Sequence, residues 1–186
     1  RQGKLEGANK EYYLDGQLNR EKMYKNNHLE GIYRVYFPNG TLFRLTPYTQ
    51  SLTDGEVKSY FKTSVLSKTK TYVMGNLEGP WKGYYESGEL KKEGRHINHT
   101  KSGVEREYYK SGALKSEISI VLNKINGIAK SYYENGALRS SVPFKHGLLE
   151  GQAKLFFPNG SLKKIENYKD GKKIGIAPKS RENSLK

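Results

Sequence analysis

Hydrophobic positions along the chain gather in short, strand-like stretches that are separated by turn-forming residues. One pair of stretches covers residues 127–133 and 138–144, with the turn Asn135-Gly136 between them. Two such stretches joined by an Asn-Gly turn are typical of a β-hairpin. No stretch has a sustained helical period with caps, so the pattern predicts an all-β chain.

This hairpin pattern recurs every 24 residues without a gap. Of the 21 Phe and Tyr residues, 19 fall in three columns of the repeat, which chance does not explain. The glycine column is Gly7, Gly31, Gly55, Gly79, Gly103, Gly127, Gly151 and Gly175. The first aromatic column is Tyr12, Tyr36, Tyr60, Tyr84, Tyr108, Tyr132 and Phe156, and the second is Tyr13, Phe37, Phe61, Tyr85, Tyr109, Tyr133 and Phe157. The leucine column is Leu18, Leu42, Leu66, Leu90, Leu114, Leu138 and Leu162, and the last column is Tyr24, Tyr48, Tyr72, His96, Ile120, Phe144 and Tyr168.

Each unit is predicted to contribute two strands, which gives about 14 strands in seven hairpins. We expect an elongated antiparallel array, built as a single-layer or solenoid-like twisted sheet, because repeat units pack mainly on their neighbours. The array forms one domain over residues 1–175, and residues 176–186 form a flexible tail. The third unit has Ser64 where the others have a turn glycine, so we predict a differently shaped turn there.

Side chains alternate between the two faces of a strand, so the two adjacent aromatic columns are predicted to point to opposite faces. The first aromatic column shares its face with a wholly basic column: Lys10, Arg34, Lys58, Lys82, Arg106, Lys130 and Lys154. The other face carries a mixed column, which is Asn9, Tyr33, Val57, Trp81, Glu105, Ala129 and Ala153. The mixed face is therefore the better candidate for packing.

The composition agrees with a thin structure in which many side chains are exposed to solvent. Of 186 residues, 34% are hydrophobic and 28% are charged, and the mean hydropathy is −0.85. The net charge of +14 favours nucleic acid, anionic lipid, acidic glycans or acidic proteins as partners. The absence of cysteine excludes disulfides and cysteine-ligated zinc. No apolar run approaches the length of a membrane-spanning helix.

The columns resemble the MORN-variant repeat, whose pattern is an aromatic pair, x-x-Gly-x-Leu, and then Tyr-Lys-x-Gly-x-x-x-Gly. Residues 84–90, 132–138 and 168–171 are the best local matches, and the resemblance covers about residues 3–175. It implies an elongated antiparallel β array with no catalytic residues of its own. Bacterial members include antitoxin-like and cell-envelope proteins, and better-known MORN proteins are associated with membranes, lipids or scaffolding. A secreted or cell-envelope location is therefore favoured over a cytoplasmic one.

The histidines, carboxylates and glycines form no recognised catalytic, metal or cofactor motif. His96 and His99 have a spacing that suits two metal ligands, but no HExxH motif or supporting carboxylate accompanies them. There is no phosphate-binding Gly-Lys-Ser/Thr loop. Trp81, the lone tryptophan, is either a core filler or a recognition anchor. We expect no catalytic residue, no metal and no cofactor.

Two functions remain open from the sequence. The first is a non-catalytic scaffold that binds another protein. The alternative is electrostatic binding of an anionic lipid surface, glycan or nucleic acid by basic residues interleaved with tyrosines. The candidate surface for either function is Lys10, Arg34, Lys58, Lys82, Arg106, Lys130, Lys154, Tyr12, Tyr36, Tyr84, Tyr108, Tyr132 and Trp81.

Overall fold

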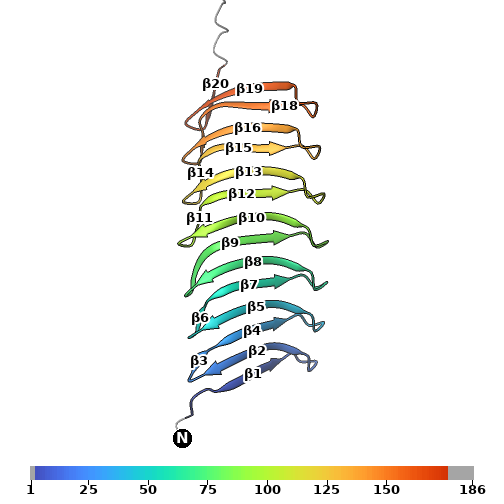
Figure 1. Cartoon of the computed structure of the whole chain (residues 1–186), viewed down its shortest axis with the longest axis vertical. Coiled ribbons are helices and arrows are strands. Elements are labelled where there is room, and N and C mark those ends of the chain that lie inside the picture. The colour runs from blue at the N-terminus through green and yellow to red at the C-terminus, as the bar shows by residue number, and fades with distance from the viewer. Residues whose placement is uncertain (1–2, 176–186) are drawn as a thin grey trace, which may run out of the picture.

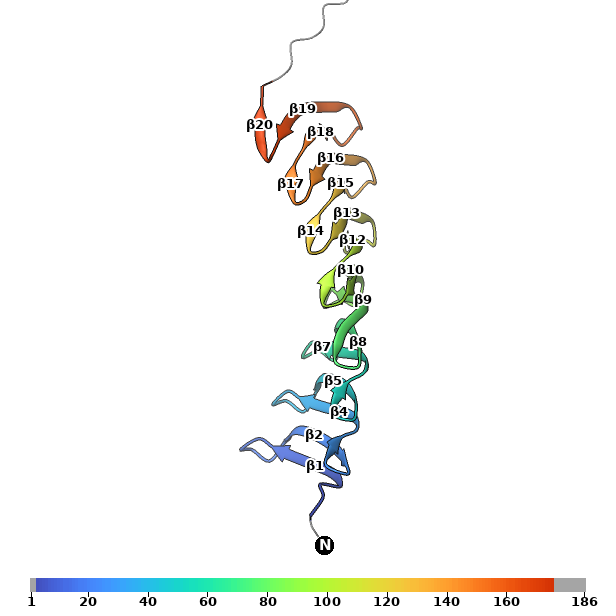
Figure 2. The same cartoon turned by 90° about the vertical axis from the view of Figure 1, so that its left-hand side faces the viewer.

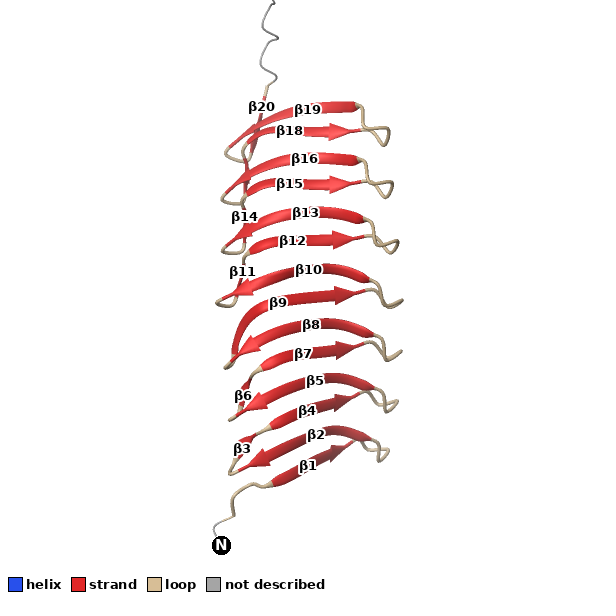
Figure 3. Cartoon of the chain, viewed as in Figure 1, coloured by secondary structure: helices blue, strands red, loops and turns tan. Residues whose placement is uncertain are grey.

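The computed structural model describes residues 3–175 as one open antiparallel sheet in which the strands follow one another in chain order (Figures 1 and 3). The predicted all-β array of hairpin repeats is confirmed. The sheet is long and narrow, with the hairpin tips along one side and the connections between units along the other (Figure 1). The tips rotate gradually about the long axis from the first unit to the last (Figure 2), as expected from the natural twist of β-strands.

Each unit contains one long hairpin, and its second strand also pairs with the first strand of the next unit. The seven hairpins are β1 (Gly7–Tyr12) with β2 (Leu18–Lys25), β4 (Gly31–Tyr36) with β5 (Leu42–Thr49), β7 (Gly55–Tyr60) with β8 (Leu66–Val73), β9 (Asn76–Tyr84) with β10 (Leu90–Ile97), β12 (Gly103–Tyr108) with β13 (Leu114–Val121), β15 (Gly127–Tyr132) with β16 (Leu138–Lys145), and β18 (Gly151–Phe156) with β19 (Leu162–Lys169). These are the 14 strands that the repeat predicted.

A short third strand, which the sequence analysis did not predict, lies in the connection between units. These strands are β3 (His28–Leu29), β6 (Leu52–Thr53), β11 (Thr100–Lys101), β14 (Lys124–Ile125), β17 (Leu148–Leu149) and β20 (Lys172–Ile174), and at the end of the third unit the equivalent residues are the first two of β9. Each pairs back on the long strand before it across a two-residue turn, as Lys25 pairs with His28. Both turn residues have positive φ, 49° at Asn26 and 68° at Asn27. This is the geometry of a type I′ hairpin turn.

The connections also hold consecutive units together. The backbone N–H of Asn27 donates to the carbonyl oxygen of Leu5 at 3.1 Å, and the N–H of Asn26 donates to Oε1 of Glu6 at 2.8 Å. The same backbone contact recurs in all seven units. An acidic or amide side chain just before the repeat glycine makes the second contact in six units, and these residues are Glu6, Glu30, Asp54, Glu78, Asn126 and Glu150. Sequence reasoning missed this column, although its regular spacing was visible.

The turn at Ser64 has the same shape as the others, so the prediction of a different turn was wrong. Ser64 has a φ of 66°, and its N–H donates to the carbonyl oxygen of Phe61 at 2.9 Å. The N–H of Phe61 donates to the carbonyl oxygen of Val65 at 2.8 Å, as at every other hairpin tip. Placing Ser in the left-handed region costs of order 1 kcal/mol, which is less than the cost of breaking the strand pairing on either side of the turn.

The two faces of the sheet differ in burial. Residues directly opposite on paired strands share a face, so Tyr33 and Thr46 lie on the same side as Gly31 and Tyr48. This face, which we call the cleft face, carries the mixed column and contains the least exposed residues of the chain, among them Ala153, Glu105 and Trp81. The other face carries the basic column and the first aromatic column, and we call it the ladder face. The prediction that the mixed face packs is confirmed. The predicted flexible tail lies outside the described residues.

Candidate functional site

The ladder face brings together the predicted basic and tyrosine columns, but carboxylates of both strands lie among them. Glu21 is 3.5 Å from Nζ of Lys10 and 3.3 Å from Arg34 in the next unit. Arg106 Nε donates to Glu117 at 2.8 Å, and Lys58 Nζ is 3.4 Å from Glu56. The face is therefore a mixed-charge surface over much of its length, and its field toward an anionic partner is reduced.

The tyrosines of the ladder face also have partners in places. The Tyr108 hydroxyl donates to Oε1 of Glu93 at 2.7 Å. Burial and this hydrogen bond raise the pKa of Tyr108, and the hydrogen bond to Glu117 raises the pKa of Arg106. Tyr12 is the most open member of the column, with 59% of its surface exposed. Trp81, the remaining predicted site residue, lies on the cleft face instead.

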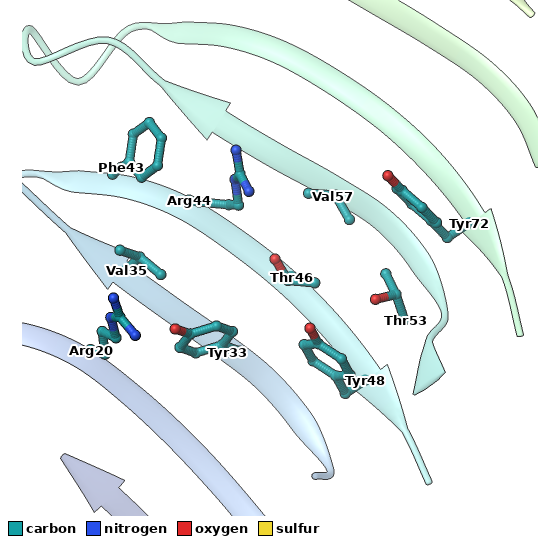
Figure 4. A pocket seen from close by; sticks show the side chains of 10 residues that line it. All are labelled: Arg20, Tyr33, Val35, Phe43, Arg44, Thr46, Tyr48, Thr53, Val57 and Tyr72. Atoms are coloured by element: carbon teal, nitrogen blue, oxygen red, sulfur yellow. The ribbon is translucent and has the colours of Figure 1, made fainter. Parts of the chain in front are cut away.

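The cleft face has a pocket of about 340 Å³ over the first three units, lined mainly by aromatic and basic side chains. Tyr33, Tyr48 and Tyr72 line one end of it, and Arg20 and Arg44 lie on successive second strands at the other end (Figure 4). The rings of Tyr33 and Tyr48 are 6.3 Å apart between centroids. A smaller pocket of about 150 Å³ adjoins it, where Arg44 is joined by Lys68 and Lys70.

These cations form a basic column that sequence reasoning missed. Arg20, Arg44, Lys68 and Lys92 are separated by 24 residues each and point to the cleft face, where Lys92 pairs with Glu105. Among the described residues, no carboxylate lies within 4.0 Å of the charged group of Arg44, Lys68 or Lys70. Burial, followed by the positive charges of Lys68, Arg44 and Lys101, lowers the pKa of Lys70. The cleft of the first three units therefore concentrates uncompensated positive charge.

A buried acid closes this basic region at the fourth and fifth units. Glu105 has 5% of its surface exposed, and its carboxylate accepts from Nζ of Lys92 and Nζ of Lys101, each at 2.7 Å. Burial disfavours ionisation, but the hydrogen bonds from Lys101 and Lys92 outweigh it, so the pKa of Glu105 is lowered. Lys101 Nζ also lies 4.9 Å from the ring centroid of Trp81. The Lys101 side chain thus covers one face of the buried Trp81 ring, which favours the interpretation of Trp81 as a core filler.

Beyond the cluster of Lys92, Glu105 and Lys101, the cleft face is less basic and has more apolar side chains. Another pocket of about 340 Å³ lies in the last two units. It is lined by four apolar side chains and Tyr168 together with four polar or charged side chains, which are Val142, Leu149, Ala153 and Leu155, and Ser131, Arg139, Ser140 and Glu166. Hydrogen bonds from Lys164, Lys173 and Tyr168 lower the pKa of Glu166 to about 2. The cleft face therefore has a basic, tyrosine-rich half over the first three units and a mixed, more apolar half at the other end.

The histidines have structural contacts. His99 Nε2 lies 3.0 Å from Oδ1 of Asn76, and its Nδ1 is 3.4 Å from the backbone N of Leu77. His96 is buried beside Trp81, with ring centroids 6.2 Å apart. Burial and the charges of Lys70 and Lys101 lower the pKa of His96. Within residues 3–175, no three His, Asp or Glu side chains are grouped as metal ligands require, and no helix is long and apolar enough to cross a bilayer.

The fold defines a tandem β-hairpin repeat array with an open sheet. The chain belongs to the MORN repeat variant family, whose pattern matches residues 5–26, 29–50, 77–98, 101–121, 125–146 and 149–170. The third unit, which contains Ser64, lies outside the matched segments. This result confirms the resemblance that the columns indicated.

Comparison with curated protein sequences gives no match. Among solved structures, the chain is similar to a GtfA/B complex bound to UDP and GlcNAc, with 15% sequence identity and a TM-score of 0.28. The similarity covers 59% of this chain and 22% of the other, so the chain spans about a fifth of that protein's length.

Proposed function

We propose that this chain is a non-catalytic binding array that holds an extended segment of another protein on its cleft face. The observation that carries the proposal is the continuous hollow of the basic half, where the two adjoining pockets share Arg44, Val57 and Tyr72. Tyrosine and arginine are the side chains that most often dominate the binding energy of protein interfaces. A long, shallow groove with these residues suits an extended polypeptide better than a small molecule.

The single open sheet supports this assignment. Repeat arrays use their elongated surface for binding because each unit offers similar contacts at a fixed spacing. Within residues 3–175, Glu105 is the one carboxylate that is buried, and two lysines hold it. A binding role accounts for the residues of the cleft without requiring any of them to be catalytic.

Electrostatic binding of an anionic lipid, glycan or nucleic acid by the ladder face is the weaker alternative. Four of its seven basic residues are in ion pairs, and these are Lys10, Arg34, Lys58 and Arg106. A cation that already has a carboxylate partner gains less from a phosphate. The cleft face, with its uncompensated cations, is the better binding surface.

The proposal is tested with a random peptide display library and site-specific blocking. The chain has no cysteine, so Ser59→Cys places a single thiol beside the cleft pocket, and Lys130→Cys places one on the ladder face as the matched control. Each variant is coupled to a maleimide polyethylene glycol. We expect the library to yield binding peptides that the Ser59 adduct blocks and the Lys130 adduct leaves bound. Failure to enrich any peptide, or blocking by the Lys130 adduct alone, would overturn the proposal.

A further inference from the structure

We propose that the segment held by the cleft is acidic and adopts a polyproline II conformation, with a carboxylate at every third residue. This inference rests on the proposed function and specifies its partner. The starting observation is the column of Arg20, Arg44 and Lys68, which places one cation on the second strand of each of the first three units. Lys70 adds a fourth charge beside Lys68.

The spacing of the column selects the conformation of the partner. Equivalent residues in successive units are two strands apart, which is about 9–10 Å. A polyproline II helix has three residues per turn and a rise of about 3.1 Å, so side chains at positions i, i+3 and i+6 project from one side at about 9 Å intervals. Acidic residues at these positions would meet Arg20, Arg44 and Lys68 in turn along the long axis of the array.

The tyrosines provide the other half of the recognition. Polyproline II segments bind in grooves lined by aromatic side chains, because their preformed conformation loses little entropy on binding. Tyr33, Tyr48 and Tyr72 line the pocket beside the basic column (Figure 4). Apolar residues between the acidic ones would therefore pack against the tyrosine rings.

Charge complementarity also limits the length of the site. Arg44 and Lys68 lack carboxylate partners among the described ion pairs, and Arg20 has only Glu11 at 3.8 Å. The fourth member of the column, Lys92, is already bound to Glu105 at 2.7 Å. Because this carboxylate already pairs with Lys92 and Lys101, an acidic segment extended past the third unit would gain less there than from the unpaired cations. The site therefore accepts three acidic positions over about seven residues.

The experiment compares labelled peptides of equal composition by fluorescence anisotropy with the full chain. One peptide is proline-rich with Glu at every third position, and a second has the same three Glu residues adjacent to one another. We expect the first to bind about tenfold more tightly or better, because only its carboxylates match the spacing of the cations. Equal affinities of the two peptides would overturn the proposal.

Two pairs of variants test whether the column is responsible. Arg44→Glu with Lys68→Glu should weaken binding of the first peptide by more than about tenfold. Lys130→Glu with Lys154→Glu makes the same change of net charge on the ladder face and should leave binding within about twofold. All four positions are exposed or half-buried, so the fold is retained, and Arg44→Gln with Lys68→Gln provides a milder second variant. An equal loss in both charge-reversed pairs would show a nonspecific effect of charge and contradict the proposal.

Two other probes test whether the cleft binds lipid or nucleic acid in place of an acidic peptide. Vesicles that contain anionic phosphatidylserine, or a single-stranded oligonucleotide, should bind more weakly than the first peptide at physiological salt. Tighter binding of either probe, lost in the Arg44→Glu and Lys68→Glu variant, would assign the column to lipid or nucleic acid. If the display library instead gives cleft-blocked peptides without acidic spacing, the binding function stands and the acidic polyproline II partner is rejected.

Discussion

The hydroxyl of Tyr109 donates a hydrogen bond to the backbone carbonyl oxygen of Tyr132, 2.9 Å away in the next unit. The same link between successive units is made by Tyr13, Tyr85 and Tyr133. In the second, third and seventh units, phenylalanine occupies the donor's position and the hydroxyl is missing. The second aromatic column therefore connects neighbouring hairpins as well as packing within them.

This connection predicts opposite effects of exchanging tyrosine and phenylalanine. Tyr109→Phe removes the donor and should lower the free energy of unfolding by about 1 kcal/mol. Phe61→Tyr adds a hydroxyl that can donate to the backbone carbonyl oxygen of Tyr84 in the next unit, and it should raise the free energy of unfolding by up to a similar amount. Urea unfolding followed by circular dichroism measures both. An unchanged midpoint in both variants would show that the hydroxyl contributes no net stability.

A second prediction concerns backbone conformation in the connections. Leu122 has a φ of 48° and 69% of its surface exposed, so it occupies the left-handed region without a compensating contact. The equivalent residue in the first unit is Asn26, which suits a type I′ turn. Leu122→Asn should therefore stabilise the chain by about 1 kcal/mol, and Asn26→Leu should destabilise it to a similar extent. Thermal unfolding of the two variants tests the prediction, which fails if both midpoints move in the same direction.

The fold was predictable because each unit repeats the same turn residues and the same aromatic columns. The short third strands were not predicted, because residues such as His28-Leu29 become a strand only through pairing with Tyr24 and Lys25. That Glu21 would pair across strands with basic residues was an expectation from the sequence, but its particular partners, Lys10 and Arg34, follow only from the strand register.

The basic column of the cleft was harder still to find in the sequence. Arg44 shares a face with Tyr48 by simple alternation, but the register shift between Val35 and Tyr36 prevents that face from being matched to the face of Tyr33 by counting across the turn. The column is also broken, with Ser116 and Ser140 in the fifth and sixth units. Only the pairing of Arg44 with Val35 and with Ser59 places it on the cleft face.

The close packing of Trp81 against Gly94 gives a third prediction. A Cβ atom added at Gly94 would lie 2.9 Å from Cζ2 and Nε1 of the Trp81 indole. Gly94→Ala should therefore displace the indole, cost about 1–3 kcal/mol and shift the emission of this single tryptophan to longer wavelength. Gly83→Ala in the same hairpin is the control, because its added Cβ would meet nothing nearer than 4.0 Å. A red shift in both variants, or in neither, would contradict this packing.

The last prediction concerns pH and the buried carboxylate of Glu105. Hydrogen bonds from Lys101 and Lys92 hold the pKa of Glu105 below its usual value, so its contribution to stability is present above the pKa of the unfolded chain, about 4.3. That contribution is lost as the pH falls through the lower pKa of the folded state. Glu105→Gln should reduce stability by about 1–3 kcal/mol at pH 7, because it removes a charged acceptor from both lysines.

Measurement of urea unfolding between pH 7 and pH 3 should show the difference between the native chain and Glu105→Gln shrinking as the carboxylate is protonated. Glu107→Gln is the matched control, because Glu107 has one lysine partner, Lys115, and a more exposed side chain. Its effect should be smaller, since an exposed ion pair contributes about 0–1 kcal/mol. If the Glu105→Gln deficit is the same at pH 3 as at pH 7, the carboxylate charge is not what the two lysines stabilise, and the neutral hydrogen bonds or the packing of the side chain must account for the burial of Glu105.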